Sequence, residues 1–99
     1  MADSKHKAAL LFEIEQELMD IPGVRAGVAV PYKRQNGLTS IGAYLVVQAG
    51  MHLSAERVLE ICRQQLGDAR SPDCIVFGKD LPLKPNGEVD REALKSRFV

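Results

Sequence analysis

Aromatic residues and net charge are both scarce in this chain. It has no tryptophan, only two tyrosines and three phenylalanines among 99 residues, and 13 basic side chains that balance 13 acidic ones. Surfaces that bind nucleic acids usually combine a basic stripe with aromatic side chains. Because the basic residues here are scattered among acidic ones, we expect no nucleic-acid partner.

Long apolar segments are also missing. No run approaches the ~18 apolar residues of a membrane-spanning helix, and the polar residues 1–7 are not followed by the apolar segment of a signal peptide. We therefore expect a cytoplasmic protein that does not bind membranes.

Cysteine and histidine, two residue types that bind metals, are few and dispersed. Cys62 and Cys74 stand alone, without C-x-x-C spacing or a histidine cluster beside them. Because each lies in an apolar pattern, we expect both to be small buried hydrophobic residues. His6 and His52 fall in polar segments and are expected at the surface. The sequence therefore predicts no metal site.

The length of the chain and its apolar residues are enough for one small domain. Two segments have the apolar spacing of an amphipathic helix, residues 7–19 and residues 55–66. A polar leader, residues 1–6, precedes the first helix and offers Ser4 as a candidate N-cap, and Ser54 is the expected N-cap of the second.

Three segments are predicted to be strands: residues 24–30, 40–48 and 74–77. We expect Pro31 to end the first strand. The second has apolar residues on both faces, which is typical of a central strand. Asn36-Gly37 predicts a tight turn that joins the first two strands as an antiparallel hairpin.

A last short helix is expected from its N-cap Asp90 through Arg97. The predicted order is α-β-β-α-β-α over residues 7–99. This is an α+β domain, in which a small three-stranded sheet with an antiparallel hairpin is packed by two main helices and a short C-terminal helix.

Four short segments carry a resemblance to motifs of one enzyme family. In chain order they are residues 12–18, 21–24, 69–72 and 81–91. Residues 81–91 read LPLKPNGEVDR, which resembles the "leu-pro-x-thr-pro-x-gly-lys-ile-asp-arg" motif of adenylate-forming enzymes. Residues 12–18, 21–24 and 69–72 are similar to that family's "gly-glu-ile-glu", "his-pro-gly-val" and "tyr-lys-val-pro" elements. The chain thus resembles the C-terminal subdomain of acyl-CoA synthetases, peptide synthetase adenylation domains and luciferases.

The chain departs from the family pattern in several places. It contains no Gly-rich phosphate-binding loop, and we expect neither the large ATP-binding domain nor the hinge motif that precede the subdomain in the family. Phe12 stands where the family has a glycine near the pantetheine tunnel, which puts direct thioester-forming contacts in doubt. Glu88 stands where the family has a lysine that acts in the adenylation step.

The exchange at Glu88 reverses a charge. The resemblance implies that the lysine stabilises negative charge in the transition state, whereas a glutamate there would repel it. Two unit charges ~4 Å apart interact by ~4 kcal/mol at an effective dielectric of 20. Glu88 could instead pair with Lys84 or Arg91, but as a lone carboxylate it does not make a Mg²⁺ site. Lys84 lies before Pro85 and is not expected to replace the missing lysine.

The other residues of the motif loop have structural interpretations. Pro85 and Gly87 are expected to shape a turn, with positive φ at Gly87. Asp90 is expected to cap the last helix. Arg91 is expected either to be solvated or to pair with a carboxylate such as Asp90 or Glu92.

Elsewhere, alternate positions on a helix do not point the same way, so the acidic residues of the first helix are interpreted as a solvated face and not as a catalytic pair. These are Glu13, Glu15 and Glu17. By resemblance, three residues are candidate contacts for a partner or carrier protein: Phe12, Arg70 and Lys84.

We expect a free-standing domain that is not an enzyme by itself. The resemblance implies an accessory module for an adenylating N-terminal domain protein or for an acyl or peptidyl carrier protein. It would hold no cofactor of its own, and would meet ATP, Mg²⁺ and a pantetheine thiol only through that partner. Two alternatives are open: a trans-acting half of a split acyl or aminoacyl ligase, and a self-associating structural module.

Overall fold

The predicted order of elements is confirmed. The computed structural model describes residues 2–98, and within them the side chains of residues 9–68 and 70–98. The helices are α1 (Ala2–Met19), α2 (Ala55–Leu66) and α3 (Arg91–Lys95), and the strands are β1 (Val24–Lys33), β2 (Thr39–Val47) and β3 (Cys74–Gly78). A short 3₁₀ turn, η1 (Asp68–Arg70), precedes β3. Within residues 2–98, no helix is long and apolar enough to span a membrane.

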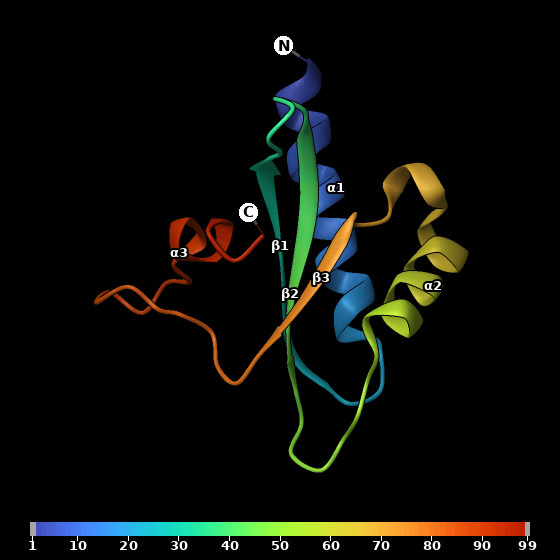
Figure 1. Ribbon diagram of the computed structural model, residues 1–99, viewed down its shortest axis with the longest axis vertical. Helices are drawn as coiled ribbons and strands as arrows, with labels where there is room; N and C mark the ends of the chain where they lie inside the picture. Colours follow the sequence, from blue (N-terminus) through green and yellow to red (C-terminus); the bar gives the residue numbers. More distant parts are fainter. Residues whose placement is uncertain (1, 99) are drawn as a thin grey trace.

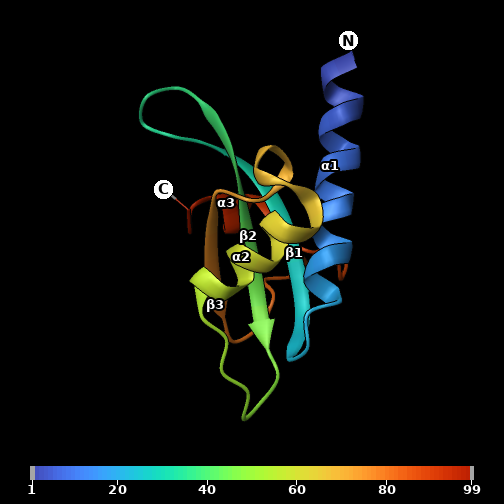
Figure 2. The same ribbon diagram turned by 90° about the vertical axis from the view of Figure 1, so that its right-hand side faces the viewer.

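The sheet has the order β1-β2-β3, with β1 antiparallel and β3 parallel to β2. Helices α1 and α2 cover one face, and α3 lies on the other (Figure 1). Figure 2 shows α1 and α2 in front of the sheet and β3 at its outer edge. The strand order confirms the expectation that the second strand is central, and helices on both sides of the sheet account for its apolar residues on both faces.

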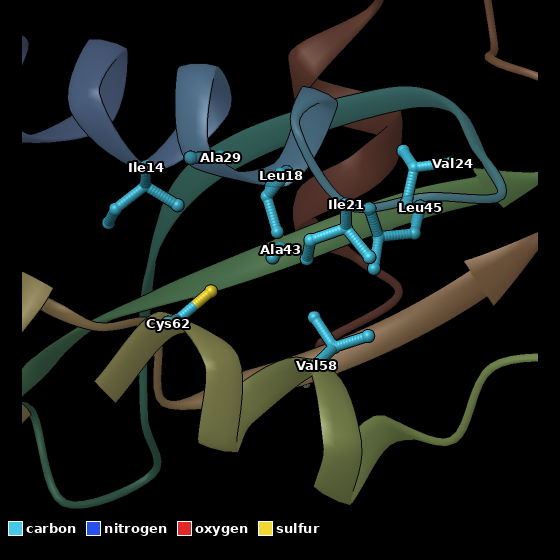
Figure 3. Packing of buried hydrophobic residues seen from close by; sticks show 9 residues of the cluster. All are labelled: Ile14, Leu18, Ile21, Val24, Ala29, Ala43, Leu45, Val58 and Cys62. Atoms are coloured by element: carbon cyan, nitrogen blue, oxygen red, sulfur yellow. The ribbon is translucent and has the colours of Figure 1, made fainter. Parts of the chain in front are cut away.

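Two apolar clusters fill the spaces on either side of the sheet. The first lies between the sheet and α1 and α2, where Ile14, Leu18, Leu45 and Val58 are buried together with Cys62 (Figure 3). The second lies under α3 and consists of Val28, Val30, Tyr44, Val46 and Leu94. Alternate residues of β2 therefore enter different clusters, as the strand period requires.

The two ends of the chain differ in detail from expectation. Helix α1 begins at Ala2 and not at Lys7, so Ser4 lies inside the helix and is not its N-cap. Residues 2–6 contain neither proline nor glycine, so no residue there interrupts a helix. At the other end, α3 ends at Lys95 and not at Arg97.

The prediction that Pro31 ends the first strand was wrong, because β1 continues to Lys33. The N–H and C=O of Ala29 bind groups outside the sheet, on Glu15 and Arg91. Since backbone groups alternate in direction along a strand, residue 31 also points away from β2. Pro31 therefore loses no hydrogen bond to β2, and its position on an edge strand tolerates the missing N–H.

The first residues of β1 also differ from a regular alternation. The pairing of β1 with β2 shifts between Val24 and Ala26. Val24 consequently joins the cluster under α1 and α2, while Ala26 packs against the cluster under α3.

Gly78 ends β3 where the side chain of Tyr44 passes close to the backbone. A Cβ at Gly78 would lie 1.6 Å from the Tyr44 hydroxyl oxygen and 2.3 Å from its Cζ. Tyr44 is 1% exposed, and its hydroxyl donates to the carbonyl of Asp80 at 2.8 Å. The glycine is therefore required by the buried position of the tyrosine.

We predict that Gly78→Ala lowers the free energy of unfolding by roughly 3 kcal/mol or more, because it forces Tyr44 out of its place and breaks the bond to Asp80. Urea unfolding monitored by circular dichroism measures the effect. Gly50→Ala is the matched control, since Gly50 has a φ of 83° and no atom lies within 4 Å of the place that an added Cβ would take. It should cost only ~1 kcal/mol of backbone strain, and equal losses would contradict the role given to Tyr44.

Candidate functional site: the motif arm

The segment between β3 and α3, residues 79–90, is called here the motif arm. In Figure 1 it extends away from the sheet on the side of α3. Its end is a small hairpin, in which Leu83 pairs with Val89. The N–H of Lys84 donates to the carbonyl of Glu88 at 2.7 Å, and the N–H of Gly87 donates to the carbonyl of Lys84 at 2.9 Å. The end of the arm is thus an ordered turn.

Two residues shape this turn. Gly87 has a φ of 89°, which confirms the predicted positive φ and is unfavourable for any residue with a Cβ. The side-chain oxygen of Asn86 accepts a hydrogen bond from the N–H of Glu88 at 3.0 Å, which is an Asx turn. Pro85 precedes them and is exposed. The backbone of Glu88 is therefore held from both sides.

The side chain of Glu88 is exposed at the end of the arm. Lys84 lies opposite Glu88 in the hairpin, and it is exposed as well. Among residues whose side chains the structure describes, Glu88 forms no ion pair, so the pairing with Lys84 or Arg91 that the sequence left open is not found. Its carboxylate is available to a charged group outside the domain.

The base of the arm is bound to the sheet where the chain leaves β3. Arg25 of β1 donates to the carbonyl of Lys79 at 3.0 Å and to the carboxylate of Asp80 at 2.7 Å. The hydroxyl of Tyr44 donates a hydrogen bond to the carbonyl of Asp80. These bonds come from two strands and fix the direction in which the arm starts.

The other end of the arm is bound at the start of α3. The N–H of Asp90 donates to the carbonyl of Pro82 at 2.8 Å, which closes the arm on itself. The carboxylate of Asp90 accepts from the N–H of Ala93 at 3.1 Å, so the predicted N-cap is confirmed. The arm therefore enters the helix through a capped first turn.

Arg91 pairs with a carboxylate, as one of its two expected roles required, but the partner is Glu15 and not Asp90 or Glu92. The Arg91 side chain remains 50% exposed. It donates to the carboxylate of Glu15 at 3.3 Å and to the carbonyl of Ala29 at 3.1 Å. Glu15 also accepts the N–H of Ala29 at 2.9 Å. We call this arrangement the edge clasp: Glu15 on α1, Ala29 on β1 and Arg91 on α3.

The interpretation of the acidic residues of α1 as a solvated face was wrong for two of them. Glu15 belongs to the edge clasp, and Glu13 forms an ion pair with Arg70 of η1. Both partners lie far away in the sequence. The spacing of acidic residues along one helix could not reveal them.

The candidate contact residues do not form one site. Phe12 on α1 is 61% exposed, and Arg70 lies on η1, whereas the motif arm lies on the side of α3 (Figure 1). A role for Phe12, Arg70 or Lys84 in binding a partner stays a prediction. The residues that hold the arm, Glu15, Arg25 and Tyr44, were not foreseen, although a tyrosine in a wholly buried strand indicates a hydrogen bond for its hydroxyl.

The cysteines differ in their surroundings. Cys62 is fully buried, as expected, while Cys74 is half-buried. Burial raises the pKa of the Cys62 thiol to about 11, and the negative charge of Glu17 adds to the shift. Among the described residues, no group of three His, Cys, Asp or Glu side chains could hold a metal ion.

The sequence matches one protein family over most of its length. The family described as "AMP-binding enzyme C-terminal domain" matches residues 13–88. The chain belongs to this family, and its sequence and fold are those of the C-terminal subdomain of adenylate-forming enzymes. The matched range ends at Glu88.

Individual relatives agree with this assignment. Surfactin synthase subunit 3 of Bacillus subtilis (strain 168) is 39% identical over 84 residues, which are 85% of this chain and 6% of that protein. A D-alanine–D-alanyl carrier protein ligase of Streptococcus agalactiae is 30% identical over 94 residues, covering 87% of this chain and 18% of the ligase. The amide bond synthetase McbA of Marinactinospora thermotolerans has a similar structure, with a TM-score of 0.81 and 26% identity over 89% of this chain and 18% of McbA. The chain thus spans less than a fifth of each of these proteins.

We predict that Glu15→Ala speeds hydrogen exchange of the Ala29 amide by at least ~10-fold, because the amide loses its acceptor, and that it lowers the free energy of unfolding by about 1–3 kcal/mol. Exchange measured by NMR and urea unfolding test this. Gln16→Ala, at the adjacent exposed position, should change neither quantity. Unchanged Ala29 exchange in Glu15→Ala would show that the edge clasp does not protect this strand.

We also predict a specific loss of stability at high pH. A thiol whose pKa is raised on folding stabilises the native state fully below its unfolded pKa, near 9, and this contribution is lost as the pH rises through about 11. Urea unfolding between these pH values should therefore show a steeper decline for the unaltered chain than for Cys62→Ala. Parallel declines would contradict the burial of a protonated thiol.

Proposed function

We propose that this domain is an accessory module for an adenylating N-terminal domain or for an acyl or peptidyl carrier protein, and that it does not itself promote adenylation. Membership of the family supports the class of partner, as do relatives that include a carrier protein ligase and a surfactin synthase subunit. The partner would supply ATP, Mg²⁺ and the pantetheine thiol.

The observation that carries the proposal is Glu88. It occupies the position at which the family resemblance implies a lysine, and its carboxylate is exposed with no ion pair among the described side chains. A carboxylate facing the phosphate and carboxylate groups of an adenylation reaction would destabilise the transition state that an ammonium stabilises. The charge reversal therefore disfavours adenylation and leaves binding or carrier-handling roles open.

The hydrogen bonds that hold the arm support a retained use for position 88. Arg25 and Tyr44 bind the arm where it leaves β3. Asp90 and the edge clasp bind it where it enters α3. Such support holds Glu88 in a defined place relative to the sheet. We propose that Glu88 meets a cationic group of the partner, since a like-charged group would be repelled.

We predict that Glu88→Lys raises adenylate formation by at least ~10-fold when the domain is mixed with the large part of an adenylating enzyme, because repulsion becomes attraction. A suitable enzyme is the D-alanine–D-alanyl carrier protein ligase, truncated before the part that this chain matches. D-Alanine-dependent ATP–pyrophosphate exchange measures the rate. The ligase's own matching part, supplied separately, is the positive control.

Two variants sharpen the comparison. Glu88→Gln removes the charge and should give an intermediate rate. Glu60→Lys makes the same charge change on the exposed face of α2 and should leave the rate at that of the unaltered chain. If the unaltered chain already supports exchange as well as Glu88→Lys does, the accessory role is wrong and the domain is the trans-acting half of a split ligase.

A further inference from the structure

The two outer edges of the sheet differ in whether their backbone groups are occupied. On β1, the outward N–H and C=O of Ala29 are bound by the edge clasp, and Pro31 has no N–H to offer. The pairing of β1 with β2 is also irregular between Val24 and Ala26. Bound groups, proline and irregular pairing all prevent a further strand from joining an edge. The edge of β1 is therefore closed.

The edge of β3 has none of these features. The N–H of Asp73 donates to the carbonyl of Ile41 in β2 at 2.7 Å. Because backbone groups alternate along a strand, those of Cys74, Val76 and Gly78 point away from β2. Within the described residues, none of these outward groups has a hydrogen bond. In Figure 1, β3 is the strand nearest to the viewer, and no segment lies in front of it.

The sequence of β3 and its two flanking residues is complementary to itself in the antiparallel direction. From Asp73 to Lys79 it reads DCIVFGK, with Val76 at its centre. If two copies pair about a two-fold axis at Val76, Asp73 of each lies opposite Lys79 of the other. Ile75 then lies opposite Phe77, whose side chain is 37% exposed in the single chain. Opposite charges and apolar pairs across two strands both favour association.

We propose that β3 is a self-association edge, at which two copies of this chain join their sheets in the antiparallel direction through β3. The outward groups of Cys74 and Gly78 then bond one another across the axis, and those of Val76 bond the same residue of the second copy. Such an interface is isologous, because each copy contributes the same surface. It uses Lys79, the first residue of the motif arm, but it does not depend on the hairpin that carries Glu88 or on the proposed accessory role.

The length of β3 sets the strength of the contact. The strand has five residues, so the buried area falls in the range of weak, transient interfaces, below ~1,200 Å². Asp73 is also engaged within its own chain, where its Oδ2 accepts the N–H of Ile41 at 2.9 Å. Its Oδ1 lies 3.7 Å from Arg34, beyond hydrogen-bond distance, and remains able to accept from Lys79 of the second copy.

Sedimentation velocity of the unaltered chain between ~20 μM and ~1 mM should show a reversible monomer–dimer equilibrium of the strength expected for a small interface. Lys79→Glu places two carboxylates opposite each other at both ends of the paired strands and should weaken the dimer at least ~10-fold. Lys33→Glu makes the same charge change at the end of the closed edge strand β1 and should leave the dimer unchanged.

Mixing two variants tests the pairing itself. Asp73→Lys should also be monomeric alone, but a mixture with Lys79→Glu should associate, because both ends of the mixed dimer then carry opposite charges. Amide exchange gives a second test that needs no variant: the amides of Cys74, Val76 and Gly78 should be slower at high concentration than at low concentration.

Three results would overturn the proposal. The first is that the unaltered chain stays monomeric up to the highest concentration and that its β3 amides exchange at the same rate at every concentration. Another is association that Lys79→Glu leaves intact, or that Lys33→Glu weakens equally. The third is protection of the β3 amides only when an adenylating protein is added, which would assign this edge to a different partner.

Discussion

The edge clasp is the interaction on which the arrangement of the chain depends. One carboxylate, on Glu15, accepts the N–H of Ala29, and one guanidinium, on Arg91, donates to the carbonyl of the same residue. Together they occupy the edge of β1 as a neighbouring strand would. Because Glu15 lies on α1 and Arg91 on α3, the same contacts join helices from opposite faces of the sheet and nearly opposite ends of the chain. The ion pair is half exposed, so its value lies more in satisfying backbone groups than in Coulomb attraction.

The edge clasp and the hydrogen bonds at the base of the motif arm fix its position. An exposed loop of about a dozen residues would ordinarily sample many conformations. Here Arg25, Tyr44 and Asp90 restrict it, and a second small hairpin restricts its end. The support is present although the charge at Glu88 is the reverse of the one that the family resemblance implies. The proposed partner-binding role rests on this combination of an intact frame and an inverted charge.

Most of the fold could be predicted from the sequence, because local patterns report burial and turns. The apolar residues on both faces of β2, the turn at Gly87 and the N-cap Asp90 all depend on nearby residues, and all were confirmed. The errors fall where a distant partner decides the outcome. Pro31 is tolerated because its backbone, like that of Ala29, faces away from β2. Arg91 pairs with Glu15, which lies 76 residues earlier in the chain.

The sequence by itself determined the elements, their order and the family, since periodicity, capping residues and motif spacing depend on residues that are close together in the sequence. It also determined that a negative charge stands at position 88. Only the tertiary structure decided which side chains hold the motif arm and which edge of the sheet is open. Those outcomes follow from hydrogen-bond partners brought together by folding, and a backbone group's direction depends on the register between strands, which no single segment specifies.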